Sequence, residues 1–349
     1  MAAKRSVEIR EFLISEIDRA AEDIVRHAQD QFGISRQAIN RYLRDLVAQG
    51  VIAAHGNTRN RSYSLVPIQT GEFHFPIGPD LHEDEVWREH VRPLLDGLAS
   101  NVLQTCQFGF TEMLNNAVDH SDGQTVLVQV NRTAATVEIV VGDDGIGIFR
   151  KIKRELNLED ERYTLLELSK GKLTTDPDKH SGQGIFFTSR VFDSFQIKSG
   201  NLFFTHTGHG PRQDWLLEDH QSETVGTLIR MRLSVASKLR LSDVFDRFAA
   251  DSDVYGFSRT IVPVALAQYG DENLISRSQA KRLLTRFDRF REVLLDFKGV
   301  DFIGQAFADE VFRVFRNEHP EVNVTWMNTE VTVESMIVGA RANSERNLP

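Results

Sequence analysis

Residues 110–123 read FTEMLNNAVDHSDG, and residues 137–149 read VEIVVGDDGIGIF. In the first stretch Glu112, Asn116 and Asp119 are spaced i, i+4 and i+7, so in a helix they share one face. The second stretch is an apolar strand pattern that runs into a glycine-rich turn. Alone, either pattern is ordinary, because Glu/Asn pairs are common on helix surfaces and Asp-x-Gly-x-Gly occurs in β-turns. Their order along the chain is informative.

A third glycine-rich stretch follows at residues 172–195, KLTTDPDKHSGQGIFFTSRVFDSF. Its Ser-Gly-Gln-Gly run at 181–184 precedes a helical pattern, and backbone amides at a helix start can face phosphate oxygens. In this order the three stretches resemble the nucleotide-binding boxes of GHKL ATPases, the class of histidine kinases, gyrase and MutL. A Walker P-loop is excluded, because no Gly-x-x-x-x-Gly-Lys-Ser/Thr occurs. The resemblance implies an ATP-binding α/β sandwich, expected over residues 80–240.

The resemblance gives roles to the matching positions. It implies that Asn116 is a ligand of Mg²⁺, which takes oxygen donors and keeps several waters. Glu112 becomes the candidate general base for the attacking water. The carboxylate of Asp143 would accept a hydrogen bond from the adenine amine. With Mg-ATP as the cofactor, the predicted nucleotide-binding residues are Asn116, Asp119, Asp143, Gly145, Gly147, Gly182, Gly184 and Thr227.

Further expectations concern the neighbours of these boxes. Asn115, beside the predicted Mg²⁺ ligand, is expected to point elsewhere. His90 lies too close to Glu112 for a separate phosphoacceptor hairpin, and we interpret residues 83–98 as the first helix of the ATPase domain. The polar stretch before the third box is similar to the flexible lid of this family. Its polar residues are Lys170, Lys172, Thr174, Thr175, Lys179 and His180.

The N-terminal part carries positive charge in an acidic protein. The formal net charge of the chain is −9, yet residues 36–61 contain five arginines against one aspartate. Three helical patterns, the third closed by Gly50, precede two short strands around a polar turn. Residues 1–66, and above all ISRQAINRYLRDLVAQGVI at 34–52, resemble a winged helix-turn-helix, whose third helix enters the major groove of DNA.

The winged-helix resemblance implies a set of DNA contacts. The start of the third helix would face base edges, and the hairpin wing would bring arginines to the backbone or the minor groove. The predicted contacts are Ser35, Arg36, Gln37, Asn40, Arg41, Arg59 and Arg61. Two other interpretations stay open, a solvated charged helix face and a winged helix that binds protein. Residues 67–79, rich in proline, are predicted to be a linker.

Strand and helix patterns alternate again from residue 253 to 340. The stretch 293–315, VLLDFKGVDFIGQAFADEVFRVF, resembles a STAS domain. STAS domains are partners of anti-sigma kinases and receive phosphate on a Ser or Thr at a helix start. Here the matching positions around Gly304, Gln305 and Ala306 carry no hydroxyl. Phosphorylation of this domain by the ATPase domain of its own chain is therefore not expected.

Composition limits the remaining possibilities. The 349 residues are 41% hydrophobic and 26% charged, which suits a multidomain α+β protein. The one cysteine excludes an intramolecular disulfide and a Cys-based zinc site. The charge-rich N-terminus is unlike a signal peptide, and no apolar run is long enough to cross a membrane. We expect a cytoplasmic protein without membrane contact.

These observations predict an ATP-responsive, DNA-binding regulator, in which ATP changes how the domains or two subunits pack. The rival hypothesis is a serine/threonine kinase of the anti-sigma-factor type that acts on a separate partner. A DNA-manipulating ATPase like gyrase or MutL is disfavoured, because no transducer-like domain or nuclease motif follows. Whether ATP is turned over stays open, as do a homodimer and a protein partner for the STAS-like domain.

Overall fold

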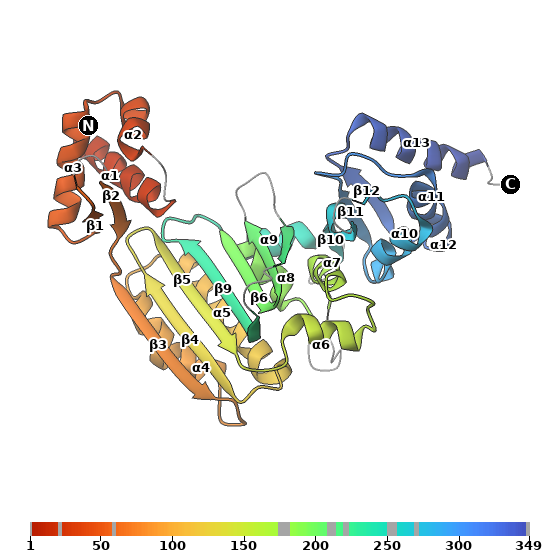
Figure 1. Cartoon of the computed structure of the whole chain (residues 1–349), viewed down its shortest axis with the longest axis horizontal. Coiled ribbons are helices and arrows are strands. Elements are labelled where there is room, and N and C mark those ends of the chain that lie inside the picture. Colours follow the sequence, from red (N-terminus) through yellow and green to blue (C-terminus); the bar gives the residue numbers. More distant parts are fainter. Residues whose placement is uncertain are drawn as a thin grey trace.

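The chain consists of three successive units, which Figure 1 shows along its longest axis. This computed structural model describes residues 2–19, 23–57, 61–173, 182–207, 214–218, 223–249, 257–268 and 272–346. A helical unit lies at the N-terminal end, a large sheet with its helices in the middle, and a smaller α/β unit at the C-terminal end. No helix in the described ranges is long and apolar enough to cross a membrane.

The N-terminal unit has three helices followed by a β-hairpin, in the order that the sequence predicts. Ser35 caps the third helix, since its hydroxyl accepts a hydrogen bond from the Ala38 amide at 3.2 Å. Ile39, Leu43 and Leu46 are buried at helical spacing in a core of this unit's own. The winged-helix resemblance and its DNA-binding role stay predictions. The elements are α1 (Ala2–Asp18), α2 (Ile24–Phe32), α3 (Arg36–Ala48), β1 (Ile52–His55) and β2 (Ser62–Leu65).

The central unit is built on a seven-stranded antiparallel sheet with the order β3-β4-β5-β9-β6-β7-β8. In β4, buried Val126, Val128 and Val130 alternate with less buried residues, so one face of the sheet is apolar. The strands are β3 (Gln69–Pro76), β4 (Thr125–Arg132), β5 (Thr136–Asp143), β6 (Ser194–Gly200), β7 (Leu202–Thr207), β8 (Asp214–Glu218) and β9 (Thr224–Ser234).

Helices cover the apolar face of this sheet, and α5 (Ser100–His120) contacts β5 and β9 there (Figure 1). Its residues Cys106, Phe110 and Leu114 are fully buried. The segment predicted as one helix over 83–98 is a short helix with a π turn and a 3₁₀ turn that end at Leu95. The other helices are α4 (Glu83–Val86), α6 (Ile148–Glu155), α7 (Tyr163–Lys170), α8 (Gly184–Val191) and α9 (Leu241–Phe248).

The predicted linker at residues 67–79 is wrong over most of its length. Gln69–Pro76 forms β3, which pairs with β4 along the edge of the central sheet. Proline has no backbone N–H to donate. Because β3 is an edge strand with one neighbour, Pro76 at its end interrupts no hydrogen bonding between two flanking strands. The prolines suggested a linker, whereas the alternation of half-buried Phe73 and Phe75 with exposed residues is a strand pattern.

The C-terminal unit is a parallel three-stranded sheet, β10-β11-β12, covered by helices. The strand predicted at 261–267 ends at Pro263, and a 3₁₀ turn follows. The apolar core of this unit is continuous with that of the central unit, so the two units pack as one body. The elements are β10 (Arg259–Pro263), α10 (Arg277–Leu284), β11 (Glu292–Asp296), α11 (Gln305–Asp309), α12 (Phe315–Glu318), β12 (Asn323–Met327) and α13 (Val331–Arg346).

A polar contact joins the N-terminal unit to the central sheet. The Asp18 carboxylate lies 2.5 Å from the guanidinium of Arg232 in β9 and 3.3 Å from the Thr136 hydroxyl in β5. β5 is paired with β9 along its whole length, from Thr136 opposite Ser234 to Asp143 opposite Thr227. The N-terminal unit therefore contacts one end of the β5/β9 pair, and Asp143 lies at the other.

Candidate functional site

A pocket of about 300 Å³ lies between α5, the ends of β5 and β9, and the start of α8. It gathers side chains and backbone from all three stretches that were singled out in the sequence. The predicted residues that line it are Glu112, Asn116, Asp143, Gly182, Gly184 and Thr227. Apolar walls from α6, α7 and β9 complete the pocket with Ile148, Ile152, Leu168 and Ile229. A few polar groups among apolar walls are typical of a small-molecule site.

Asp143 ends β5 with its carboxylate fixed in direction. Its Oδ1 accepts hydrogen bonds from the amides of Gly145 at 2.9 Å and Thr227 at 3.2 Å. The Thr227 hydroxyl accepts one from the Ile148 amide at 3.0 Å. Burial raises the pKa of Asp143, and the hydrogen bonds from Gly145 and Thr227 oppose that rise. The result is an oriented, mostly buried hydrogen-bond acceptor at one side of the pocket.

One face of α5 supplies a polar stripe. Glu112, Asn116 and His120 follow at i, i+4 and i+8, and all three line the pocket. Asn115 lines it too, so the expectation that Asn115 points elsewhere is wrong. Residues three and four positions after Glu112 lie on the same side of a helix, so Asn115 and Asn116 can both face the pocket. The sequence-based assignment overlooked this. Asp119 is exposed on α5 and is not among the residues that line the pocket.

The Glu112 carboxylate lies against the start of α8. A Cβ atom added to Gly184 would come within 2.2 Å of Glu112 Oε2, so only glycine leaves room for the carboxylate there. Backbone amides at a helix start favour negative charge. Glu112 therefore lies where the Gly182–Gly184 segment begins α8, with Asn116 one turn further along α5.

Gly145 and Gly147 are not among the residues that line the pocket. A Cβ atom at Gly145 would lie 2.0 Å from the carbonyl oxygen of Ser121, at the end of α5. The glycine therefore allows the turn after β5 to pack on the end of α5. The neighbouring Asp144 accepts hydrogen bonds from the amides of Gln124 and Thr125, which ties down the same turn.

Lys151 is a pocket residue that the sequence analysis missed. It lies on α6, its side chain is only 13% exposed, and its ammonium lies 3.7 Å from the Asp122 carboxylate. Lys151 is three residues after Ile148 and one before Ile152, and both of these also line the pocket. That helical spacing directly after a glycine-rich turn was the signal available in the sequence.

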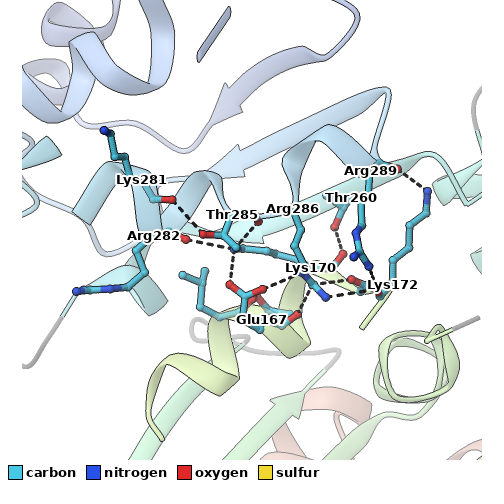
Figure 2. A network of polar contacts seen from close by, with 12 residues as sticks. Glu167, Lys170, Lys172, Thr260, Lys281, Arg282, Thr285, Arg286 and Arg289 are labelled. Atoms are coloured by element: carbon cyan, nitrogen blue, oxygen red, sulfur yellow. Dashed lines mark hydrogen bonds and ion pairs between the residues drawn. The ribbon is translucent and has the colours of Figure 1, made fainter. Parts of the chain in front are cut away.

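The predicted lid is corrected at its first two residues. Lys170 is fully buried, and both Lys170 and Lys172 make hydrogen bonds to the C-terminal unit, as Figure 2 shows. They are therefore not part of a polar flexible stretch over the pocket. The remaining predicted lid residues lie outside the described part of the chain; these are Thr174, Thr175, Lys179 and His180.

The predicted DNA contacts lie on the outer side of α3 and on the hairpin. Arg36, Gln37, Arg41 and Arg61 are exposed, and Asn40 is half-buried. Ser35 is exposed, although its hydroxyl is used to cap α3. Arg59 lies outside the described residues.

Among the residues that the structure describes, no group of three or more His, Cys, Asp or Glu side chains could hold a metal ion. The pocket offers the Asn116 amide and the Glu112 carboxylate as oxygen donors. Such a set fits Mg²⁺ carried by a nucleotide, since Mg²⁺ is commonly held by one or two side chains plus phosphates and water.

Two parts of the chain match known protein families. Residues 85–203 match a histidine kinase-like ATPase domain, and residues 279–334 match a STAS-like domain of unknown function. The first match contains every pocket residue predicted from the sequence except Thr227, and the second contains α11 and β12. Among curated proteins no significant match is found. The chain thus carries an ATPase-type domain followed by a STAS-like domain.

Proposed function

We propose that the pocket binds Mg-ATP and that the protein is an ATP-responsive, DNA-binding regulator. The observation that supports this most is the convergence of Asp143, Asn116, Glu112 and the Gly182–Gly184 segment on one pocket, within a domain that matches histidine kinase-like ATPases. Nucleotide binding is implied by that domain type, and the roles of individual residues are the proposal.

Each polar group has a part of the nucleotide to recognise. Asp143, oriented by two amides, accepts from the exocyclic amine on C6 of adenine, where guanine carries a carbonyl oxygen. Asn116 holds Mg²⁺, which neutralises charge on the phosphates. The amides at the start of α8 and the Lys151 ammonium donate to phosphate oxygens. Glu112 orients or deprotonates the water that attacks the terminal phosphate.

DNA is the proposed partner of the N-terminal unit. The support is the exposure of Arg36, Gln37 and Arg41 on one helix and of Arg61 on the hairpin, in a chain whose net charge is −9. In a protein that is acidic overall, a single basic patch is the one surface that attracts the negatively charged nucleic acid. The Asp18 contact to Arg232 links this unit to β9, which also carries Thr227 of the pocket.

A second candidate function is a protein kinase of the anti-sigma-factor type. The STAS-like match at residues 279–334 favours it, since such domains accompany these kinases. The start of α11, Gly304 followed by Gln305 and Ala306, offers no hydroxyl to phosphorylate. In this alternative the phosphoacceptor belongs to a separate protein.

Calorimetry with ATP and GTP in the presence of Mg²⁺ tests the proposal. The wild-type chain should prefer ATP, and Asp143→Asn should weaken ATP binding, because an amide presents a different hydrogen-bonding pattern to the adenine amine. Asn116→Ala should reduce the dependence of ATP affinity on Mg²⁺. Asp84→Asn, an exposed change on α4, is the matched control. Equal ATP affinity in the Asp143 and Asn116 variants and the wild type would contradict this assignment.

A further inference from the structure

The C-terminal end of α7 is capped by a residue of another unit. The last carbonyl groups of a helix have no partners inside the helix. The guanidinium of Arg286, in the loop after α10, donates to the carbonyl oxygens of Glu167 at 3.0 Å and Gly171 at 2.9 Å. It also reaches the Lys172 carbonyl at 3.3 Å. Figure 2 shows this guanidinium at the end of α7.

The capping is reciprocal, because Lys170 of α7 reaches the end of α10. Its ammonium donates to the carbonyl oxygens of Arg282 at 3.3 Å and Thr285 at 3.0 Å. The Thr260 hydroxyl of β10 donates to the Lys170 carbonyl at 2.7 Å. A cation near a helix C-terminus is stabilised by the helix dipole. Each of the two helices therefore ends on a basic side chain that the other unit supplies.

A single carboxylate lies between these two cations. Glu167 has one oxygen 2.7 Å from the Lys170 ammonium and the other 2.9 Å from Arg286 Nε. The contact with Arg286 is an ion pair without the alignment of a hydrogen bond. The side chains of Glu167, Lys170 and Arg286 are 2%, 0% and 8% exposed. The buried cluster carries one negative and two positive charges. The carbonyl oxygens at the two helix ends compensate the excess positive charge.

Apolar contact alone would already join the two units. Phe257 packs against Phe186 of α8 with ring centroids 4.6 Å apart and against Phe290 at 5.5 Å. Buried ion pairs add little net stability, because desolvation opposes their attraction. Their hydrogen bonds are directional, however, so the charged cluster fixes the position of the end of α7 more closely than apolar packing does.

The segment held in this way forms a wall of the nucleotide pocket. Leu168 and Leu173 line the pocket on either side of the capped helix end. The Leu173 amide donates to the carbonyl oxygen of Gly182 at 3.0 Å, and Gly182 belongs to the segment that leads into α8. Lys172, directly before Leu173, makes two hydrogen bonds with Arg289. The Lys172 ammonium donates to the Arg289 carbonyl oxygen at 2.6 Å, and the Arg289 guanidinium donates to the Lys172 carbonyl oxygen at 3.2 Å. The C-terminal unit thus holds Lys172, the residue directly before the one that contacts Gly182.

We infer that Arg286 is a positioning residue of the nucleotide pocket, through which the STAS-like unit and ATP regulate one another. The inference rests on the proposed binding of Mg-ATP. Arg286 is not among the residues that line the pocket and acts through the α7 end, Leu173 and Gly182. Because coupling free energies are reciprocal, a change in docking that weakens ATP binding implies that ATP tightens docking by the same factor. The C-terminal unit thereby senses whether the pocket is filled.

The test compares Arg286→Ala, Arg286→Lys and Arg316→Ala in the full chain. Arg316 is exposed on α12 of the same unit and is the matched control. ATP affinity by calorimetry should fall by about 5- to 150-fold in Arg286→Ala, the usual range of coupling between sites. Arg286→Lys should restore part of it, and Arg316→Ala should equal the wild type. Circular dichroism identifies any variant that fails to fold.

Amide hydrogen exchange of the wild-type chain gives a second readout that needs no variant of the interface. A non-hydrolysable ATP analogue with Mg²⁺ should slow exchange in residues 284–290, which do not line the pocket. In Asp143→Asn this protection should be lost. Unchanged exchange at 284–290 on nucleotide binding, or a folded Arg286→Ala with wild-type ATP affinity, would overturn the inference and leave the ATP proposal intact. Absence of ATP binding by the wild type would overturn both.

Discussion

The Lys170 ammonium lies 2.7 Å from a Glu167 carboxylate oxygen, and both side chains are buried between the ATPase-type domain and the STAS-like domain. Burial lowers the pKa of Lys170 to about 8 from 10.5, although Glu167 favours the charged form. The second cation of the cluster, Arg286, adds to the lowering. The two domains are thus joined by a titratable contact.

The first prediction is a pH dependence of stability that belongs to Lys170. Between pH 8 and 10.5 the unfolded chain binds more protons at this lysine than the folded chain does, so its contribution to the free energy of unfolding rises with pH. The wild type should gain stability over Lys170→Met by up to about 1.4 kcal/mol per pH unit in this window. Urea unfolding at pH 8, 9 and 10 measures this difference.

The control for that series is Lys281→Met, an exposed lysine that pairs with Glu310 inside the C-terminal unit at 3.8 Å. It should leave the pH slope of the wild type unchanged. A difference between wild type and Lys170→Met that stays flat or falls as the pH rises would show that the folded chain keeps Lys170 charged throughout.

The second prediction separates binding from turnover at Glu112. Glu112→Gln should retain ATP affinity and lose hydrolysis or phosphotransfer by about 10²- to 10⁴-fold, the usual contribution of a general base. The measurement is phosphate release, with electrophoresis of any phosphoprotein, with and without DNA. Turnover at the wild-type rate would make Glu112 a structural residue. If the wild type does not turn ATP over, ATP would act only as a ligand whose binding the protein senses.

The third prediction concerns the close approach of Gly184 to Glu112. A methyl group at residue 184 would lie 2.2 Å from Glu112 Oε2, so Gly184→Ala must displace the carboxylate and should reduce both turnover and ATP affinity. In a Glu112→Ala background the same change has no carboxylate to displace. Its additional effect on ATP affinity should then be small, and a double-mutant cycle measures that coupling. Equal effects in both backgrounds would refute a direct clash.

The fourth prediction assigns phosphate binding to Lys151. Lys151→Met should lower affinity for ATP by about 10- to 100-fold, the value of a hydrogen bond to a charged group. Affinity for adenosine should change little, since that ligand has no phosphate. Lys153→Met, two residues further on α6 and not among the pocket-lining residues, is the control. Equal losses for ATP and adenosine would place Lys151 near the base or the ribose instead.

The fifth prediction concerns DNA. Binding by residues 6–66 should weaken with salt by a log–log slope of about −0.9 per phosphate neutralised. Arg61→Ala should weaken all duplexes and flatten that slope, whereas Arg36→Ala or Asn40→Ala should cost about 1–3 kcal/mol at particular bases. Fluorescence anisotropy across a salt series measures both, with Arg88→Ala on the central unit as the control.

A chain that starts near residue 70 would lack the whole N-terminal unit. If this shorter chain bound DNA as tightly as the full chain, the N-terminal unit would be a protein-docking module. The kinase hypothesis would then be preferred over the regulator.

Local patterns were enough for the elements that carry their signal within a few residues. The order of three helices and a hairpin follows from caps and turns such as Ser35 and Gly50, and α5 follows from its apolar spacing. The three glycine-rich or polar boxes indicate one nucleotide site because their order is a property of the chain itself. Glu112, Asn116 and Asp143 do meet in one pocket.

Other features depend on neighbours far away in the sequence. Gln69–Pro76 is a strand because β4, which begins 49 residues after Pro76, pairs with it. Asn115 lines the pocket and Asp119 does not, a difference that depends on where later segments such as the start of α8 meet α5.

The sequence by itself determined that an ATPase-type domain precedes a STAS-like domain and that Glu112, Asn116 and Asp143 belong together, because helix caps, strand alternation and box spacing are local properties. Only the tertiary structure decided what Lys170 and Lys172 do. Both read as polar lid residues, yet Lys170 is fully buried, where its ammonium meets the Glu167 carboxylate and the carbonyls at the end of α10. A lysine is buried only where charges and hydrogen-bond acceptors compensate it. Here the charge comes from Glu167 on the same helix, and the carbonyl acceptors come from residues more than one hundred positions away.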